Sequence, residues 1–264
     1  MVVIYILLIV FGLPIGSFLN VLIYRIPLGE EFVKTPSHCP NCGKQLKPLE
    51  LIPVFSWLIQ RGRCKGCGAP ISKQYPIIEA TNALLWVLCA FANSYFNGGF
   101  VAPDLPLQCL MLTALLTLSV IDARTREIPF GINVFIFALG IALLVLEFIF
   151  FRPDAFRNQA ITQAIGFVAV SVPLLLIERI SGGRAIGGGD VKLMAAAGLF
   201  LGWKLILLAL IIGCIAGSII HIVRMKIAGA NRYLALGPYL AGGIAVSMLC
   251  GNWIIYQYLS LFSA

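Results

Sequence analysis

Long apolar stretches alternate with short polar segments along most of the chain. The first stretch, residues 1–24, carries no charged side chain and ends at Arg25. A single transmembrane helix needs roughly 20 apolar residues, so the run 191–223 is too long for one helix, and we expect a turn near 202–204. The later apolar stretches are 77–97, one that ends at Ile121, one that ends near Phe151, 160–178, 191–203, 205–223 and 236–262. The pattern therefore predicts about eight transmembrane helices.

One segment interrupts this pattern. Residues 26–76 contain four of the eight cysteines together with seven basic residues. We expect a small soluble insert between the first and second transmembrane helices. The predicted organisation is a first helix at 1–25, the insert at 26–76 and a helical membrane domain at 77–264.

Composition supports a membrane protein. The chain is 60% hydrophobic and 11% charged, with a mean hydropathy of +0.96, whereas soluble domains carry about 25% charged residues. Only helices or closed barrels satisfy their backbone groups in lipid, and these apolar runs are too long for barrel strands. The predicted fold class is an all-α polytopic membrane protein. Because residues 1–24 lack a basic start, we expect a retained helix rather than a signal peptide.

The basic residues indicate how the chain is oriented. If eight helices start outside, 16 of the 19 Lys and Arg residues fall on the cytoplasmic side. This asymmetry predicts that both termini are periplasmic and that the insert is cytoplasmic. The net charge of +8 is then explained by topology and by attraction to anionic lipid, with no nucleic-acid partner.

The cysteines of the insert form two CxxC motifs separated by 21 residues. Each motif supplies two thiolates on a tight turn, and four thiolates complete a tetrahedral zinc site. A closed site of four cysteines has no free position for a substrate, so we expect structural zinc. A redox pair or free thiols are the alternatives. The predicted ligands are Cys39, Cys42, Cys64 and Cys67.

Two acids stand at the ends of apolar runs on the predicted cytoplasmic face. Asp122 ends one run, and Asp190 follows three glycines and begins another. Two neighbouring carboxyl groups in a partly dry site share a proton, so one activates water while the other polarises a carbonyl. The alternatives are capping or ion pairing with nearby basic residues, and proton- or ion-coupled transport. The predicted substrate-binding glycines are Gly187, Gly188 and Gly189, which leave room for an extended backbone.

Several motifs together resemble the prepilin peptidases, the leader peptidases and N-methyltransferases of type IV pilus and type II secretion systems. Where many relatives have IPFGP before the last helix, this chain has LALGP, and we expect this departure to leave the acids untouched. The similar segments are GSFLNVLIYRIP at 16–27, the cysteine insert at 37–80, Asp122 with IP at 128–129, GGGDVKL at 187–193 and LGPYLA at 236–241.

The resemblance implies an aspartic endopeptidase of the bacterial inner membrane, with Asp122 and Asp190 as the catalytic pair. It implies membrane-inserted prepilin or pseudopilin substrates, which are cut after a glycine at the end of a short basic leader. It also implies N-methylation of the new N-terminus with S-adenosylmethionine. Glu79 resembles the glutamate of the family's YPxxE element, and we expect it to bind substrate or to hold the insert.

Other functions remain open from the sequence. One alternative is a GxGD protease that cuts other membrane peptides, and another is a non-enzymatic transporter or zinc-stabilised assembly scaffold. The sequence leaves open which pilin is processed, where the methyl donor binds and whether the protein is a homodimer. It also leaves open which aspartate holds the shared proton, because that proton belongs to the pair.

Overall fold

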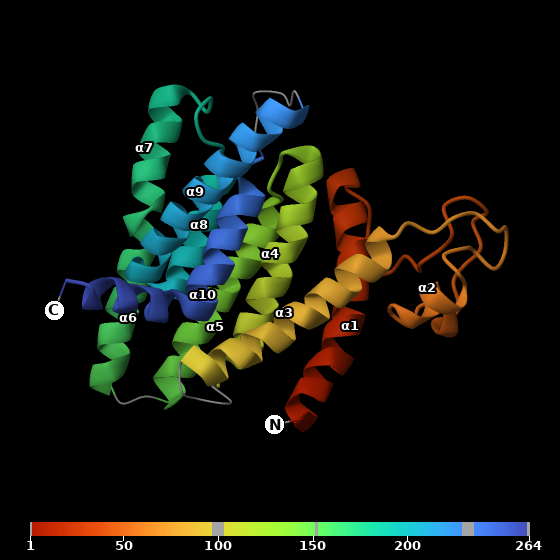
Figure 1. Ribbon diagram of the computed structural model, residues 1–264, viewed down its shortest axis with the longest axis horizontal. Coiled ribbons are helices and arrows are strands. Elements are labelled where there is room, and N and C mark those ends of the chain that lie inside the picture. The colour runs from red at the N-terminus through yellow and green to blue at the C-terminus, as the bar shows by residue number, and fades with distance from the viewer. Residues whose placement is uncertain (1, 97–102, 151–152, 229–234, 263–264) are drawn as a thin grey trace. The chain divides into compact units, whose positions relative to one another are not determined.

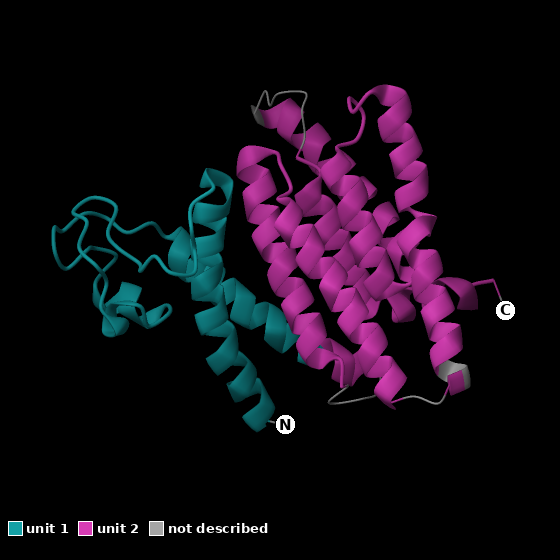
Figure 2. Cartoon of the chain, turned by 180° about the vertical axis from the view of Figure 1, so that it is seen from behind, with its two compact units in different colours: residues 1–91 teal, residues 92–264 magenta. Residues whose placement is uncertain are grey.

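The computed structural model describes residues 2–96, 103–150, 153–228 and 235–262. Parts of three expected polar connections, at 97–102, 151–152 and 229–234, lie outside this description. The described secondary structure is helical apart from two isolated bridges in the insert. The chain divides into two compact units, residues 1–91 and 92–264 (Figure 2). The all-helical class expected from the sequence is confirmed.

Unit 1 contains helix α1 (Val2–Arg25) and most of helix α3 (Gln74–Phe96). The two helices approach closely at Gly16, where an added Cβ would lie 2.7 Å from the Cα of Glu79. The side-chain amide of Asn82 donates to the carbonyl of Gly12 at 2.8 Å. Small residues with interhelical hydrogen bonds are a common way to pack helices in lipid. The first two predicted transmembrane helices are therefore paired in the structure.

The insert between α1 and α3 is mostly irregular and is held by hydrogen bonds. Arg25, which is buried at the end of α1, donates to the carbonyls of Glu31 at 3.0 Å and Thr35 at 2.8 Å. These bonds fold the start of the insert back onto the helix end. The short elements of the insert are η1 (Ile26–Leu28), η2 (Pro48–Glu50) and α2 (Phe55–Ile59).

Unit 2 is a helical bundle with α8 at its centre. Helix α8 contacts α5, α6, α7 and α9, and its side chains Leu193, Met194 and Ala197 are fully buried. The helices of the bundle are α4 (Leu105–Thr125), α5 (Phe130–Phe150), α6 (Pro153–Ala169), α7 (Ser171–Ser181), α8 (Gly188–Leu201), α9 (Trp203–Ala228) and α10 (Gly237–Ser260).

Helices α6 and α8 touch through their backbones. A Cβ on Gly166 would clash with the carbonyl oxygen of Gly198, and a Cβ on Gly198 would clash with that of Gly166. Gly243 of α10 lies equally close to the carbonyl of Ala209 in α9. Glycine is needed at these positions because any side chain would force the helices apart. This packing fixes the helix that carries Asp190.

Within the described residues, seven segments are long and apolar enough to cross a membrane, with Phe156–Ser181 of α6 and α7 counted as one, where about eight were expected. The sixth expected apolar segment forms α8, but its 14 residues span only about 21 Å at 1.5 Å per residue, less than the roughly 30 Å hydrocarbon core. The expected turn near 202–204 is confirmed, because Gly202 ends α8 with a positive φ of 78° and a ψ of 170°, and α9 begins at Trp203. Helices α8 and α9 therefore form an uneven hairpin.

The fifth expected segment, 160–178, differs from the structure at its start and in its middle. Helix α6 already begins at Pro153, where a polar turn was expected, since proline suits the first turn of a helix. The helix stops at Ala169, and α7 continues from Ser171. Pro173 has no N–H to donate to the carbonyl four residues earlier, at Ala169, which explains the break.

The helix ends of unit 2 are distributed between the two ends of the bundle as the charge asymmetry predicts. The ends of α4, α7 and α9 lie at the same end of the bundle (Figure 1). The N–H of Gly237, at the start of α10, donates to Asp122 near the end of α4. Asp122 and Asp190 therefore share one end of the bundle. Its assignment to the cytoplasm stays a prediction.

Candidate active site

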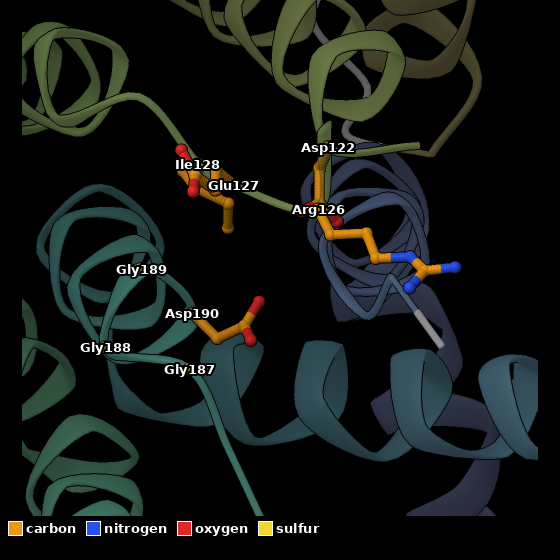
Figure 3. A pocket seen from close by; sticks show the side chains of 8 residues that line it. All are labelled: Asp122, Arg126, Glu127, Ile128, Gly187, Gly188, Gly189 and Asp190. Atoms are coloured by element: carbon orange, nitrogen blue, oxygen red, sulfur yellow. The ribbon is translucent and has the colours of Figure 1, made fainter. Parts of the chain in front are cut away.

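A pocket of about 340 Å³ opens between the end of α4 and the start of α8. Its walls come from both helices and from the connection between α4 and α5. Figure 3 shows Asp190 extending from the start of α8 towards the end of α4, which carries Asp122. The lining residues are Asp122, Arg126, Glu127, Ile128, Gly187, Gly188, Gly189 and Asp190. The structure thus brings together both aspartates and all three glycines selected from the sequence.

Asp122 is fixed in the last turn of α4. Its side chain is buried, with 4% exposed, and its Oδ2 accepts the N–H of Gly237 at 3.0 Å. The helix ends at Arg126, which adopts a left-handed conformation with φ 59° and donates its N–H to the Asp122 carbonyl at 2.8 Å. The aspartate is therefore held through both its backbone and its carboxylate.

Asp190 lies in the first turn of α8, after Gly187 in an extended conformation with ψ 144°. It is half-buried. Burial, and next the negative charge of Asp122, raise the pKa of the Asp190 carboxyl to about 6. A carboxyl whose pKa is raised towards neutral pH, beside a second carboxyl, is suited to acid–base chemistry.

The glycines let the loop before Asp190 pack tightly. An added Cβ on Gly189 would lie 3.0 Å from the Cβ of Ile128, and one on Gly188 would lie 3.2 Å from Oε1 of Glu178. At Gly187 the nearest atom is Oδ2 of Asp190, at 3.4 Å. A side chain at any of the three would narrow the pocket or push against its wall.

Neither aspartate forms an ion pair with a described lysine or arginine. Lys192 instead places its Nζ 5.3 Å from the centre of the Phe130 ring, and the Arg126 side chain points away from Asp190 (Figure 3). The ion-pair alternative for the two acids therefore finds no partner in the described part of the chain.

Gly237 is a site residue that the sequence analysis missed. Its amide binds Asp122 directly, and Gly237 belongs to the Gly-Pro pair that LALGP shares with IPFGP, so the expectation that the departure itself leaves the acids untouched stays a prediction. An added Cβ at Gly237 would lie 2.6 Å from Oδ2 of Asp122. The available signal was the Gly-Pro pair at the start of an apolar run, because the first amides of a helix have no partner within the helix.

The four cysteines of the insert form a second candidate site, in unit 1. Their sulfur atoms all lie within 4.8 Å of one another, and the Sγ atoms of Cys39 and Cys67 are 3.9 Å apart. Tetrahedral zinc with Zn–S bonds of about 2.3 Å places its sulfurs about 3.8 Å apart. The donor set therefore fits a metal ion of this kind, and Cys42 and Cys64 complete it.

The two CxxC motifs have the same backbone geometry. The N–H of Cys39 donates to the carbonyl of Lys44, and that of Cys64 donates to the carbonyl of Ala69, both at 2.9 Å. A left-handed glycine follows each second cysteine, Gly43 in one motif and Gly68 in the other. The N–H of Gly66 points at the sulfur of Cys64 at 3.3 Å, as expected for a metal knuckle.

Glu79 joins the insert to α3. Its Oε2 accepts the N–H of Val54 at 2.6 Å, and its side chain is buried. Val54 has a φ of 62°, which is rare for a β-branched residue, and Phe55 donates back to Pro53 at 2.6 Å. The glutamate thus holds a strained three-residue turn. A role for Glu79 in substrate binding stays a prediction.

Comparison with known proteins shows which family the chain belongs to. Residues 109–222 match the type IV leader peptidase family, and residues 10–93 match the bacterial peptidase A24 N-terminal domain. The prepilin leader peptidase/N-methyltransferase of Stutzerimonas stutzeri is 32% identical, over 95% of this chain and 92% of that protein. The chain belongs to the type IV leader peptidase family.

Other members of the leader peptidase family are similar. The protein of the same name from Myxococcus xanthus is 34% identical, but its match covers 83% of this chain and 63% of that protein. The protein of the same name from Aeromonas hydrophila is 30% identical, over 96% of this chain and 92% of that protein. No solved structure matches. Both aspartates lie in the segment that matches the leader peptidase family, and the four cysteines lie in the matched N-terminal domain.

Proposed function

We propose that this protein is an aspartic endopeptidase that removes the leader peptide from type IV prepilins or pseudopilins and then methylates the new N-terminal residue. The observation that supports this most directly is that Asp122 and Asp190, far apart in sequence, line one pocket. The names of the relatives support the substrate class and the second activity.

In the proposed cleavage step, one aspartate is ionised and the other is protonated. The ionised carboxylate takes a proton from water, and the water oxygen bonds to the scissile carbonyl carbon. The protonated carboxyl gives its proton to the carbonyl oxygen. The C–N bond then breaks, and the leaving nitrogen takes a proton from the pair. The glycines at 187–189 leave room for the extended substrate backbone beside the acids.

The four cysteines would hold a structural zinc ion. Four thiolates fill its tetrahedral shell, so the ion would stabilise the insert and leave no position for substrate. S-adenosylmethionine would donate the methyl group when it is bound. Glu79 keeps the insert attached to α3 through Val54, and we propose that the insert supports the methylation activity.

The proposed location is the bacterial inner membrane, with the aspartates and the insert in the cytoplasm and both termini in the periplasm. The distribution of Lys and Arg residues supports this orientation. In this proposed orientation the acids would lie on the cytoplasmic side, where a basic leader would remain after insertion of the substrate.

The test uses Asp122→Asn and Asp190→Asn in the full-length protein, with a membrane-inserted prepilin as substrate. Each variant is expected to lower leader cleavage by more than about 10³-fold, because catalytic residues that act as a unit are each indispensable. Asp104→Asn is the control, since Asp104 lies at the start of α4 and binds Gln108. Mass spectrometry of the product reports cleavage and the added methyl group. Near-normal cleavage by either variant would overturn the two-aspartate mechanism.

A further inference from the structure

The insert of unit 1 carries an exposed apolar helix face. Phe55, Leu58 and Ile59 lie at positions i, i+3 and i+4 of α2, and this spacing places them on one side of the helix. Their side chains are 57%, 57% and 75% exposed. The neighbouring element η2, which contacts α2, adds Leu49, which is 76% exposed. An exposed apolar patch of this kind marks a contact with a partner or with a membrane.

The opposite side of α2 is bound to the rest of the insert. The indole N–H of Trp57 donates to the carbonyl of Ile71 at 3.2 Å. The Trp57 ring also packs against Gly62, where an added Cβ would lie 2.9 Å from Cζ2 of the ring. Trp57 follows Phe55 by two residues, which is about 200° around a helix with 3.6 residues per turn. The apolar face therefore cannot turn inward unless these contacts break.

A hydrogen bond ties the start of α2 to a helix that can span the membrane. The N–H of Val54, just before α2, donates to Oε2 of Glu79 at 2.6 Å. Glu79 lies five residues after Gln74, the first residue of α3, or about 7.5 Å along the helix at 1.5 Å per residue. Helix α3 is long and apolar enough to cross a membrane. Within unit 1, α2 lies alongside α1 rather than beyond its end (Figure 1). The start of α2 is therefore level with the first turns of α3, where headgroups meet acyl chains.

Basic side chains accompany the apolar face. Residues 44–73 contain six lysines and arginines but one acid, Glu50, which pairs with Lys44 at 2.9 Å. Arg61 and Arg63, which follow α2, are both exposed. Helices that lie in the membrane surface bury an apolar face about 5–10 Å into the boundary between headgroups and acyl chains and carry lysine and arginine beside it. Basic clusters next to a spanning helix attract anionic lipid. The charge of this segment therefore favours a lipid surface as its partner.

We infer that α2 docks on the membrane surface, with its apolar face among the acyl chains and with Arg61 and Arg63 at the phosphates of anionic lipids. One face of the insert would then be bound to the membrane, whereas a wholly soluble insert was expected from the sequence. The docked helix would hold the cysteine cluster close to the headgroups. The inference does not depend on leader cleavage, and it requires only that the chain spans a membrane.

The first test labels the wild-type protein from the lipid. The full chain is placed in vesicles of phosphatidylcholine and phosphatidylglycerol that contain a lipid with a photo-reactive diazirine on its acyl chain. After irradiation and digestion with trypsin, labels are expected on the peptide 45–61, which contains α2. The peptides 35–44 and 66–73 come from the two cysteine knuckles and are internal controls that should remain unlabelled. Absence of label from 45–61, or equal labelling of all three peptides, would overturn the inference.

The second test changes the charges. Arg61→Gln with Arg63→Gln is compared with Arg61→Lys with Arg63→Lys, which keeps both charges, in vesicles with and without phosphatidylglycerol. Each basic residue near an anionic surface strengthens binding by about fivefold. Phosphatidylglycerol should therefore raise the labelling of α2 severalfold more in the wild type and the lysine variant than in the glutamine variant. Chymotryptic peptides allow all three proteins to be compared. Labelling that ignores phosphatidylglycerol in every protein would overturn the contact with anionic lipid.

A third test identifies what covers the apolar face. Photo-reactive benzoylphenylalanine at Ile59, in the full-length protein in the same vesicles, is expected to cross-link to lipid. Cross-links to unit 2, to a second copy of the chain or to an added prepilin, in place of lipid, would overturn the inference. Leader cleavage by the wild type is measured in the same vesicles, and its presence or absence decides the proposed function separately.

Discussion

The four cysteines come from two short loops of the insert, whereas the two aspartates come from α4 and α8, which are separated in the chain by three other helices. In the cysteine cluster, hydrogen bonds between residues four and five positions apart shape each loop, and two of the four cysteines are exposed. In the aspartate pocket, Asp122 is buried and is bound by an amide of α10.

The difference shows two ways of building a site. The cysteine loops are formed locally, but only a bound ion can join them strongly, because the insert has few buried apolar residues. The aspartate pocket needs no ligand, because packed helices hold its acids in place. We therefore expect the first site to depend on metal and the second to depend on helix packing.

The largest expected effect comes from breaking the cysteine cluster. Cys39→Ser is expected to abolish binding of the zinc ion proposed for this cluster, and structural zinc contributes about 10–16 kcal/mol to the folding of small zinc domains. The insert should then become sensitive to limited proteolysis, while metal analysis reports the lost ion. Leader cleavage should fall much less, because the residues that line the aspartate pocket all lie in unit 2.

The control for this variant is Cys214→Ser, since Cys214 is exposed on α9 and lies outside the cluster. A wild-type protein that contains no zinc would contradict the prediction. Equal loss of cleavage and of the folded insert would show that the two sites are not independent.

A single methyl group should disturb the aspartate pocket. Gly237→Ala places a Cβ 2.6 Å from Oδ2 of Asp122, so either the carboxylate or the start of α10 must move. A displacement of about 1 Å in a catalytic group can cost about 10²-fold in rate, and we expect a 10- to 100-fold loss of kcat. Gly242→Ala is the matched control, because nothing lies within 4 Å of its added Cβ. Equal activity of the two variants would rule out this role of the Gly237 contact.

The pH dependence tests whether the aspartates interact. Because the pKa of Asp190 is raised to about 6, its carboxyl keeps a proton at a higher pH than an ordinary aspartate. Cleavage needs one protonated carboxyl, so kcat/KM should fall as pH rises above 6, approaching about tenfold per pH unit. In Asp122→Asn the pKa of Asp190 should drop, since the neighbouring charge is gone, but remain raised by burial. Infrared titration of the carboxyl would measure this, and an unchanged pKa would argue against the interaction.

The smallest expected effect concerns the link between the insert and α3. Glu79→Gln keeps an oxygen that accepts the Val54 N–H but removes the charge, which should weaken this bond by about 1 kcal/mol. Hydrogen exchange at Val54 would report the change. A large rise in KM without faster exchange would instead favour substrate binding by Glu79.

The sequence was most informative where chemistry is local. The CxxC spacing is enough to predict the cysteine cluster, because two thiolates three residues apart share one turn. The charge pattern placed Asp122 and Asp190 at the same end of the bundle, which the structure confirms for unit 2. It could not show that Gly237 binds Asp122, since the contact depends on how α10 packs against α4.

Several helix boundaries and one turn depend on details of the backbone that the hydrophobic pattern does not show. The early start of α6 at Pro153 and its break before Pro173 follow from the missing proline N–H rather than from apolar pattern. The length of α8 is set by the turn at Gly202. The strained turn at Val54 is held by a glutamate distant in sequence, and no local pattern predicts it.

The two cysteine knuckles repeat each other at a distance of 25 positions, including their bridges, His38 with Gln45 and Arg63 with Pro70. Each knuckle supplies half of the ligands and has no apolar core of its own. A chain with one knuckle formed therefore gains little stability, and such intermediates should not accumulate. Metal uptake and folding of the insert should occur as one cooperative event, with a single transition as zinc is titrated.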